Sequence, residues 1–392
     1  MTSNKAKKLK KVMFVLNIPA PYRAFFFSTL DFVLRQKGIN LFVVYCAKSE
    51  PDRDWDFISN KNSYRHVILR EQPYVIGGHP IHLNASIWKL INEECPDTII
   101  IGGSWHMPTG WIAHLAGKRI GAQLLFWSES HAMAVRNPSG FIPVIRRLAY
   151  KQYERFCAPN RLSADWINRV RNKSSDIVAL PNLVDEAVFV SSGLQEGKES
   201  RPNSQYALKL VQVSKLEDHK GVLPLVEAVI GLNREMPGSV HLTLVGNGIQ
   251  YALVAEMIVQ CSDPAAIALL GACKQAQVAE ALRNADVFIL NTRFDPNPIS
   301  VIEALFCGKP IIVTEVCGNA HEVVHVGENG YIIPNAEEIG PAIRNLLRQY
   351  LEDPLAIKTM GRRSLEIAAS RFSALSASED LLRQLQSTGD LT

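Results

Sequence analysis

Short apolar runs alternate with amphipathic segments along this chain, and the whole alternation occurs twice. Strands are expected at 12–16, 40–46, 97–103 and 122–128, and again at 208–214, 241–246, 286–291 and 310–314. Between them, apolar residues recur at helical spacing, as in 22–36, 87–94, 110–119, 222–234 and 249–260. The pattern predicts an α/β protein with two Rossmann-like, doubly wound domains.

The domain boundaries follow from length and from one irregular stretch. A chain of 392 residues exceeds what one hydrophobic core usually serves. The aperiodic segment SSGLQEGKESRPNSQ favours a linker at 191–206, between a first domain at 1–190 and a second at 207–374. Residues 375–392, with a helix at 379–386, are expected to pack back on the first domain. Ligands of such sheets bind at the carboxyl ends of the strands, so two facing domains would form a cleft.

Composition and cysteine usage indicate a folded protein of the cytoplasm. Hydrophobic residues make up 47% and charged residues 20%, as in ordinary globular proteins. The seven cysteines show no CxxC pair, which favours reduced thiols. The apolar run Val12 to Leu16 is too short for the core of a signal peptide, and polar and glycine residues interrupt 98–117, so neither export nor a spanning helix is expected.

Positive residues gather in two places although the net charge is only +4. They lie in KAKKLKK at 5–11 and in RRLAYKQYERF at 146–156. Solvated surface is one interpretation, and weak attraction to an anionic membrane, on its inner face, is the other. Nucleic acid is not expected as a partner.

The segment DPNPISVIEALFCGKPIIVT, at 295–314, predicts an anion site. A strand ends at Asn291, and a helix should begin near Pro298, with Asn297 as its cap, and stop at Gly308. Free N–H groups of the first helical turn, such as that of Ser300, would then lie at the end of a strand and could bind phosphate.

Two lysines strengthen this expectation. Lys215 and Lys220 follow another strand in VSKLEDHKG, within the same layer of loops. A diphosphate leaving group needs its growing charge neutralised, and fixed cations with a helix N-terminus can do so without a metal ion. For either lysine alone, an ordinary surface position is the simpler interpretation.

The segment 291–334 resembles the C-terminal signature of the large retaining GT-B glycosyltransferase family 4, also called glycosyltransferase group 1. VSKLEDHKG, LTLVGNG and ALPNLVDEAVF resemble further elements of that family, in the same order. The resemblance covers most of 176–372 and is weaker over 12–175. It implies a GT-B fold in which the first domain binds the acceptor and the second binds a nucleotide sugar.

The family's Glu-x7-Glu pair falls on Asp295 and Glu303. By this resemblance, Glu303 binds the ribose hydroxyls of the nucleotide and Asp295 binds hydroxyls of the donor sugar. A diol offers two donors to the two oxygens of a carboxylate, which explains an acid inside an apolar helix. With Lys215 and Lys220 these acids form the expected catalytic set. The other residues expected to bind the donor are Asn297, Pro298, Ile299, Ser300, Gly246, Asn247, Ala272 and Lys274.

Two departures from the family pattern bear on the donor. Asp295 is one methylene shorter than the usual glutamate, so either the sugar lies closer to it or a different sugar hydroxyl is bound. Lys215 stands where arginine is usual, which replaces a bidentate fork by a point charge. The sequence does not decide whether the nucleotide of the donor is UDP or GDP.

The acceptor candidates follow strands of the first domain. Tyr22 and Arg23 come from NIPAPYR, Trp105 and His106 from GGSWHMPTG, and Glu129 and His131 from WSESH. A structural role is an equal or better alternative for each residue taken alone. The motif DRDWD at 52–56 looks like a metal-binding Asp-x-Asp pair but sits too early in the chain, so neither a metal ion nor any other cofactor is expected.

The leading functional prediction is a retaining, metal-independent glycosyltransferase. It would move a sugar from a UDP- or GDP-sugar to a carbohydrate or lipid-linked saccharide, in the synthesis of cell-surface polysaccharides or glycoconjugates. Alternatives are a GT-B nucleotide-sugar epimerase and a protein that binds nucleotide sugars without catalysis. A dinucleotide-dependent oxidoreductase is disfavoured because VGNGIQ is only a fragment of GxGxxG.

Overall fold

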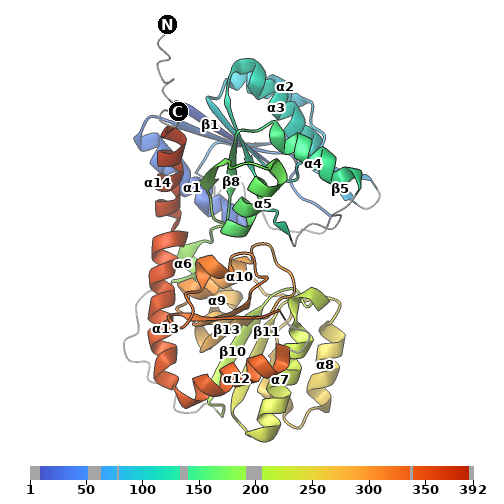
Figure 1. The fold of residues 1–392 in the computed structure, drawn as a ribbon, viewed down its shortest axis with the longest axis vertical. Helices are drawn as coiled ribbons and strands as arrows, with labels where there is room; N and C mark the ends of the chain where they lie inside the picture. Colours follow the sequence, from blue (N-terminus) through green and yellow to red (C-terminus); the bar gives the residue numbers. More distant parts are fainter. Residues whose placement is uncertain are drawn as a thin grey trace. The chain divides into compact units, whose positions relative to one another are not determined.

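The computed structural model describes residues 9–51, 63–76, 79–132, 140–190, 205–335 and 339–387. The chain forms two compact units (Figure 1). Unit 1 comprises Met1–Val184 together with Ser373–Thr392, and unit 2 comprises Asp185–Phe372. Each unit is described by itself below. Every apolar run named above as a strand forms one in the structure.

The boundary between the units lies a few residues before the expected one. Helix α6 (Glu186–Phe189) belongs to unit 2 because its end is bound there. Phe189 is fully buried, its carbonyl accepts from the Cys307 thiol at 3.6 Å, and Arg283 donates to the carbonyl of Val188 at 3.1 Å. Most of the predicted linker, 191–204, lies outside the described residues.

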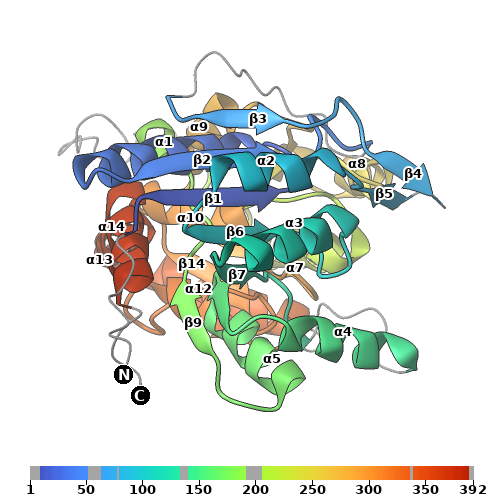
Figure 2. The ribbon, with the colours of Figure 1, turned by 90° about the horizontal axis from the view of Figure 1, so that it is seen from above.

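Unit 1 is built on a seven-stranded parallel sheet in the order β3-β2-β1-β6-β7-β8-β9. Its strands are β1 (Lys11–Leu16), β2 (Asn40–Tyr45), β3 (His66–Ile68), β6 (Thr98–Gly102), β7 (Gln123–Trp127), β8 (Arg155–Ala158) and β9 (Asp176–Ala179). A separate hairpin, β4 (Tyr74–Ile76) with β5 (His79–Ile81), lies beyond the arrowheads of β1, β2 and β3 (Figure 2).

Helices cover both faces of this sheet. They are α1 (Pro21–Gln36), α2 (Ser86–Glu94), α3 (Pro108–Ile120), α4 (Phe141–Lys151) and α5 (Arg161–Arg171). The interior strand β1 is buried from Val12 to Leu16 with no exposed side chain, because both faces of a doubly wound sheet are covered. Unit 1 thus has an apolar layer on each side of β1.

The C-terminal helix α14 (Ala374–Gln386) packs in unit 1, against α1 and the end of β9 (Figure 1). Its buried stripe includes Leu381, Leu382 and Leu385. Gln384 fixes its register, because its carbonyl accepts from Arg155 at 3.0 Å and its side chain accepts from the Ala179 amide at 3.0 Å.

Unit 2 has a six-stranded parallel sheet in the order β12-β11-β10-β13-β14-β15. Numbered within the unit, this order is 3-2-1-4-5-6, that of dinucleotide-binding sheets. Its strands are β10 (Leu208–Val213), β11 (Val240–Val245), β12 (Ile267–Leu269), β13 (Val287–Leu290), β14 (Ile311–Thr314) and β15 (Gly330–Ile333). Its helices are α6 with α7 (Val222–Glu235), α8 (Tyr251–Gln260), α9 (Gln275–Asn284), α10 (Ile299–Phe306), α11 (Ala320–Val323), α12 (Ile339–Glu352) and α13 (Pro354–Ile367).

Candidate functional site

The strand order of unit 2 places a topological switch point between β10 and β13. The chain leaves β10 toward β11 on one side, and β13 lies on the other side of β10. Ligands of open parallel sheets bind at such a switch point, at the carboxyl ends of the strands. The loop after β10 carries Lys220, and the loop after β13 carries Asp295.

Lys220 and Asp295 are joined by an ion pair between Nζ and Oδ2. Each side chain is 13% exposed, so the pair is shielded but open to a ligand. The other carboxylate oxygen, Oδ1, accepts from the backbone amide of Asn297 at 3.2 Å. An ammonium group has three donors and a carboxylate has about four lone-pair sites, so both groups retain capacity for further hydrogen bonds.

Backbone contacts hold the loop that carries Asp295. The Asn291 side-chain amide donates to the carbonyl of Gly221 at 2.6 Å, and Thr292 Oγ1 donates to the carbonyl of His219 at 2.8 Å. On the far side, the Gly318 amide donates to the carbonyl of Asp295 at 2.8 Å. Gly221 has φ +67, and a Cβ there would lie 2.2 Å from the Asn291 carbonyl oxygen, so only glycine allows this approach.

Helix α10 begins directly after this loop. The expected cap, Asn297, is not at the cap position, because Pro298 occupies it and the helix starts at Ile299. Proline has no capping side chain, and no side chain caps the first turn. The N–H groups of this turn, which include that of Ser300, therefore remain available to an anion. The helix stops as expected, with Cys307 as C-cap and Gly308 at φ +65.

Glu303 lies one turn into α10 and is partly buried. Burial raises the pKa of its carboxyl to about 7. In the described part of the chain no hydrogen-bond donor or cation contacts this carboxyl. A carboxylate in this position gains from a ligand that brings its own donors.

The VGNG loop after β11 packs closely on the loop after β10. Gly246 has φ +139, and a Cβ there would lie 1.8 Å from the carbonyl oxygen of Ser214. Asn247 is exposed, and its carbonyl accepts from the Leu216 amide at 3.0 Å. Lys215 is 69% exposed and lies 3.9 Å from a carboxylate oxygen of Glu217, so it does not join the Lys220–Asp295 pair.

Two further residues expected to bind the donor lie at the surface. Ala272 is exposed in the loop after β12, and Lys274 is the N-cap residue of α9. The Lys274 amide donates to the side chain of Gln277 at 2.9 Å. The Lys274 carbonyl accepts from the amides of Gln277 and Val278, so both main-chain groups of Lys274 are engaged by the first turn of α9.

Unit 1 has its own switch point, between β1 and β6. The Arg23 guanidinium donates to a carboxylate oxygen of Glu129 at 2.6 Å and lies 4.7 Å from the ring of Trp127. The loops after β1 and β6 touch here, because a Cβ on Gly103 would lie 2.2 Å from the side-chain oxygen of Asn17. The structure thus brings Arg23 and Glu129 together at the carboxyl ends of three strands.

The remaining acceptor candidates differ in burial and in the residues that they contact. Tyr22 is partly buried beside Arg23, with the guanidinium 5.5 Å from its ring. Trp105 and His106 form an edge contact with their ring centroids 5.2 Å apart. Burial first, and the Arg146 charge second, lower the pKa of His106. His131 is 1% exposed, so its ring lies inside the unit.

Within the described residues, no group of three or more His, Cys, Asp or Glu side chains could hold a metal ion. The motif DRDWD at 52–56 lies outside the described residues. Among the described helices, none combines the length and the apolar composition needed to cross a membrane.

One residue near the unit 1 switch point escaped the sequence reasoning. Arg146 appears in the sequence only as part of a basic run, yet it is 9% exposed on the inner side of α4. Its guanidinium lies 5.7 Å from the rings of both Trp105 and Trp166. A helical projection of α4 could have placed it beside Ala149 and Tyr150, the other buried residues of that helix.

Comparisons with known proteins relate this chain to glycosyltransferases. Residues 196–364 match the family model described as "Glycosyl transferases group 1". The chain is 25% identical over 316 residues to the N-acetyl-alpha-D-glucosaminyl L-malate synthase of Bacillus anthracis, covering 79% of this chain and 80% of that one. It is 24% identical over 208 residues to the N,N'-diacetylbacillosaminyl-diphospho-undecaprenol alpha-1,3-N-acetylgalactosaminyltransferase of Campylobacter jejuni, covering 51% and 53%.

Solved structures show the same fold. The HepE protein of Anabaena, solved in complex with UDP, superposes with a TM-score of 0.73 at 17% identity, covering 96% of this chain and 100% of that one. The fold is GT-B, with two Rossmann-like α/β units, as predicted.

Proposed function

We propose, from the match of residues 196–364 to the glycosyl transferases group 1 family model, that the chain is a retaining, metal-independent glycosyltransferase. Its donor is a UDP- or GDP-sugar bound by unit 2. Its acceptor is a carbohydrate or lipid-linked saccharide bound by unit 1, in the synthesis of cell-surface polysaccharides or glycoconjugates in the cytoplasm. The Bacillus relative joins a sugar to malate, and the Campylobacter relative acts on a diphospho-undecaprenol-linked sugar, so both small and lipid-linked acceptors occur among the relatives.

The observation that carries the proposal is the carboxyl group of Glu303. It is partly buried in an apolar helix, its pKa is raised to about 7, and no described residue donates to it. A ribose diol supplies two donors to its two oxygens. Four residues earlier the same helix begins with uncapped N–H groups, which suit a diphosphate.

The Lys220–Asp295 pair completes the proposed donor site. Asp295 holds Lys220 in place while two ammonium protons remain for phosphate oxygens, and the free lone pairs of Asp295 accept from a sugar hydroxyl. As the sugar leaves, charge grows on the diphosphate, and Lys220 with the α10 N-terminus stabilises it. In this proposal the protein, and not a divalent ion, neutralises the growing charge.

A donor panel tests this function. Thermal shifts of the full chain are measured with UDP-, GDP-, ADP-, dTDP- and CMP-sugars, with and without EDTA. We expect stabilisation by one nucleotide class, unchanged by EDTA and abolished in Glu303→Gln, while Glu227→Gln, an exposed glutamate on α7, behaves as wild type. Stabilisation that requires a divalent ion contradicts the metal-free site. Donor binding without transfer to any saccharide acceptor favours a binding protein, and isomerisation of the donor favours an epimerase.

Helix α4 supports a lipid-linked acceptor. Phe141, Val144, Ile145 and Leu148 on this helix are 52–85% exposed, and cationic Arg147 and Lys151 flank them. Apolar side chains beside cations fit the surface of an anionic membrane. Of the N-terminal lysines noted in the sequence, Lys5, Lys7 and Lys8 lie outside the described residues.

Vesicle flotation tests this surface. The full chain should float with vesicles containing phosphatidylglycerol at low salt, and binding should fall at least tenfold in the double variant Phe141→Ser/Ile145→Ser. The control Ile249→Ser removes an equally exposed side chain, 84% accessible, from unit 2 and should bind normally. Equal binding by the α4 variant would show that this face is not the membrane contact.

A further inference from the structure

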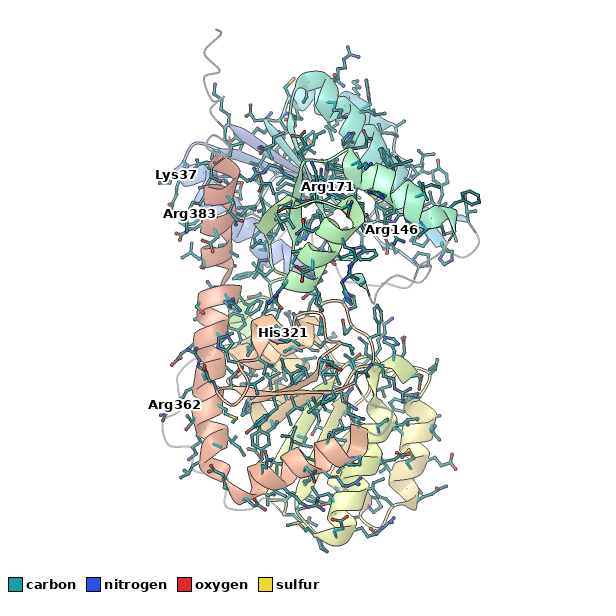
Figure 3. All side chains as sticks on the ribbon, viewed as in Figure 1. Lys37, Arg146, Arg171, His321, Arg362 and Arg383 are labelled. Atoms are coloured by element: carbon teal, nitrogen blue, oxygen red, sulfur yellow. The ribbon has the colours of Figure 1, made fainter. Side chains whose placement is uncertain are left out.

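Arg146 differs from the other buried arginines of unit 1. Arg155, 8% exposed, is paired with Asp176 at 2.6 Å, and Arg171, 5% exposed, donates to the carbonyl of Glu154 and to Ser175 Oγ at 3.3 and 3.0 Å. Arg146, 9% exposed, makes neither a hydrogen bond nor an ion pair with any other described residue. Figure 3 labels Arg146 and Arg171, which lie on neighbouring helices.

The surroundings of Arg146 leave its donors open while fixing its side chain. The rings of Trp105 and Trp166 each lie 5.7 Å from its guanidinium carbon. Nη1 of Arg155 and Nε of Arg171 are fully buried and lack a hydrogen-bond partner in the described part of the chain. The nitrogens of Arg146 also lack a partner among the described residues but are not fully buried. The stem is thus buried and the guanidinium fork reaches the surface between two aromatic rings.

This arrangement has an electrostatic cost that its neighbours do not remove. Taking a guanidinium largely out of water is unfavourable without an anionic partner, and contact with tryptophan rings offsets only part of this cost. Two described polar groups beside it bring no negative charge. The pKa of His106 is lowered by burial first and by the Arg146 charge second, and the Tyr150 hydroxyl is hydrogen bonded to Ser128 Oγ at 2.9 Å. An oxyanion would complete the site, because a planar fork binds phosphate or carboxylate in a bidentate manner.

The location connects this fork to the acceptor side of unit 1. Trp105 and His106 follow β6, and Ser128 follows β7, so the elements around Arg146 end at the carboxyl edge of the sheet. Helix α4 extends toward the side on which the arrowheads of β1 and β6 lie (Figure 2). The same edge carries the Arg23–Glu129 pair.

We propose that Arg146, held between Trp105 and Trp166, binds an anionic group of the acceptor, either a phosphate or a carboxylate. This inference rests on the proposed glycosyltransferase function for the identity of the ligand, but not for the existence of the anion site. It predicts that acceptors carrying such a group are preferred over neutral saccharides. Arg146 positions the acceptor and takes no part in bond making.

Tryptophan fluorescence provides the test, because all six tryptophans of the sequence precede residue 167 and unit 2 has none. An anion bound at the Lys220 site therefore meets no tryptophan of unit 2, whereas one at Arg146 contacts two tryptophans of unit 1. The full chain is titrated with inorganic phosphate, pyrophosphate and succinate at constant ionic strength. We expect saturable quenching by the phosphates or by succinate, and the better probe identifies the class of anion.

The variants separate a built site from general surface charge. In Arg146→Met the dissociation constant should rise at least tenfold, and Arg146→Lys should retain part of the binding. The matched control is Arg147→Met, because Arg147 is the next residue but is exposed, and its dissociation constant should change less than twofold. Lys220→Met, which disables the proposed donor site, should leave the quenching intact.

Three results would overturn the proposal: no saturable quenching in the wild-type chain, equal binding by Arg146→Met, or equal loss in Arg147→Met. Unchanged far-UV circular dichroism of Arg146→Met and Arg146→Lys verifies that the variants are folded. Because the assay needs neither donor nor turnover, it stays informative if no nucleotide sugar binds. Conversely, donor binding without anion binding would leave the proposed function intact and remove only the role of Arg146.

Discussion

Glu303→Gln should make unit 2 more stable at alkaline pH while abolishing donor binding. The folded protein raises the pKa of the Glu303 carboxyl from 4.5 to about 7. Between these values the folded state holds more protons than the unfolded state, so the carboxyl lowers the free energy of unfolding as pH rises from 4.5 through 7. Glutamine has the same shape and cannot ionise, which removes this loss.

The magnitude follows from the size of the shift. A difference of about 2.5 pKa units corresponds to at most about 3.4 kcal/mol above pH 7. Because the side chain is partly exposed, solvent screening reduces the expected gain to about 1–2 kcal/mol at pH 8. At pH 4.5 and below, the wild type and Glu303→Gln should differ by less than about 0.5 kcal/mol, since both carry a neutral side chain.

The assay must report on unit 2, which has no tryptophan. Hydrogen exchange followed by mass spectrometry on peptides covering 208–213 and 299–306 measures the opening free energy at pH 8 and, after correction for intrinsic exchange, at pH 5. Tryptophan fluorescence of unit 1 in urea serves as an internal control and should not shift. Glu227→Gln controls for loss of an exposed carboxylate. A less stable Glu303→Gln at pH 8 would refute the reasoning, because the carboxylate would then be stabilised by a partner within the free protein.

Three further perturbations follow from the described contacts. Lys220→Met and Asp295→Asn should each destabilise unit 2, and the double variant should lose about 1–3 kcal/mol less stability than the sum of the two single losses. The same exchange assay measures this double-mutant cycle. Strictly additive losses would mean that the ion pair contributes nothing. Gly246→Ala should lower the free energy of unfolding by about 1–3 kcal/mol and weaken donor binding, because the new Cβ would lie 1.8 Å from the carbonyl oxygen of Ser214. The control Gly327→Ala, at φ +81 with open space around it, tests backbone strain alone and should cost about 1 kcal/mol. Equal losses of stability in urea melts would exclude the clash. Burial lowers the pKa of His114 to about 4, so between pH 6.5 and pH 4 the folded state holds fewer protons than the unfolded state, and the free energy of unfolding of unit 1 should fall by about 2–3 kcal/mol as pH falls through that window. In urea titrations followed by tryptophan fluorescence, His114→Leu should make this free energy depend less on pH. An unchanged pH dependence would show that other groups cause the acid sensitivity.

The two sheets could be predicted from the sequence because parallel strands buried on both faces consist of continuous apolar runs. The runs at 12–16 and 208–214 needed no tertiary information to be recognised, and each became an interior strand beside the switch point of its sheet. Short strands such as β8 at Arg155–Ala158 and those of the β4–β5 hairpin were not predicted from the sequence. Strands of three or four residues, some with charged side chains, are too short to show a recognisable hydrophobic pattern.

The candidate donor residues could be named from sequence, but their pairing could not. Lys220 and Asp295 lie 75 positions apart, and their contact depends on which strands are neighbours in the sheet. Lys215, equally plausible in the sequence, lies at the surface beside Glu217. The cap of α10 was placed one residue early because Asn297 has the better capping side chain, whereas the geometry of the loop gives the position to Pro298. Arg146 was missed because the sequence was interpreted as one basic run, in which Arg146 and Arg147 look alike, although only Arg146 lies on the buried side of α4.

Helix α14 has a consequence for how the protein is made. Unit 2 is one continuous segment, whereas unit 1 is assembled from 1–184 and the final stretch that contains α14. On the ribosome, residues 1–184 therefore emerge without the helix that covers part of α1, and nearly 190 residues are synthesised before it arrives. Unit 2 can complete its core first, so the earliest half of the chain to appear is the last to finish folding.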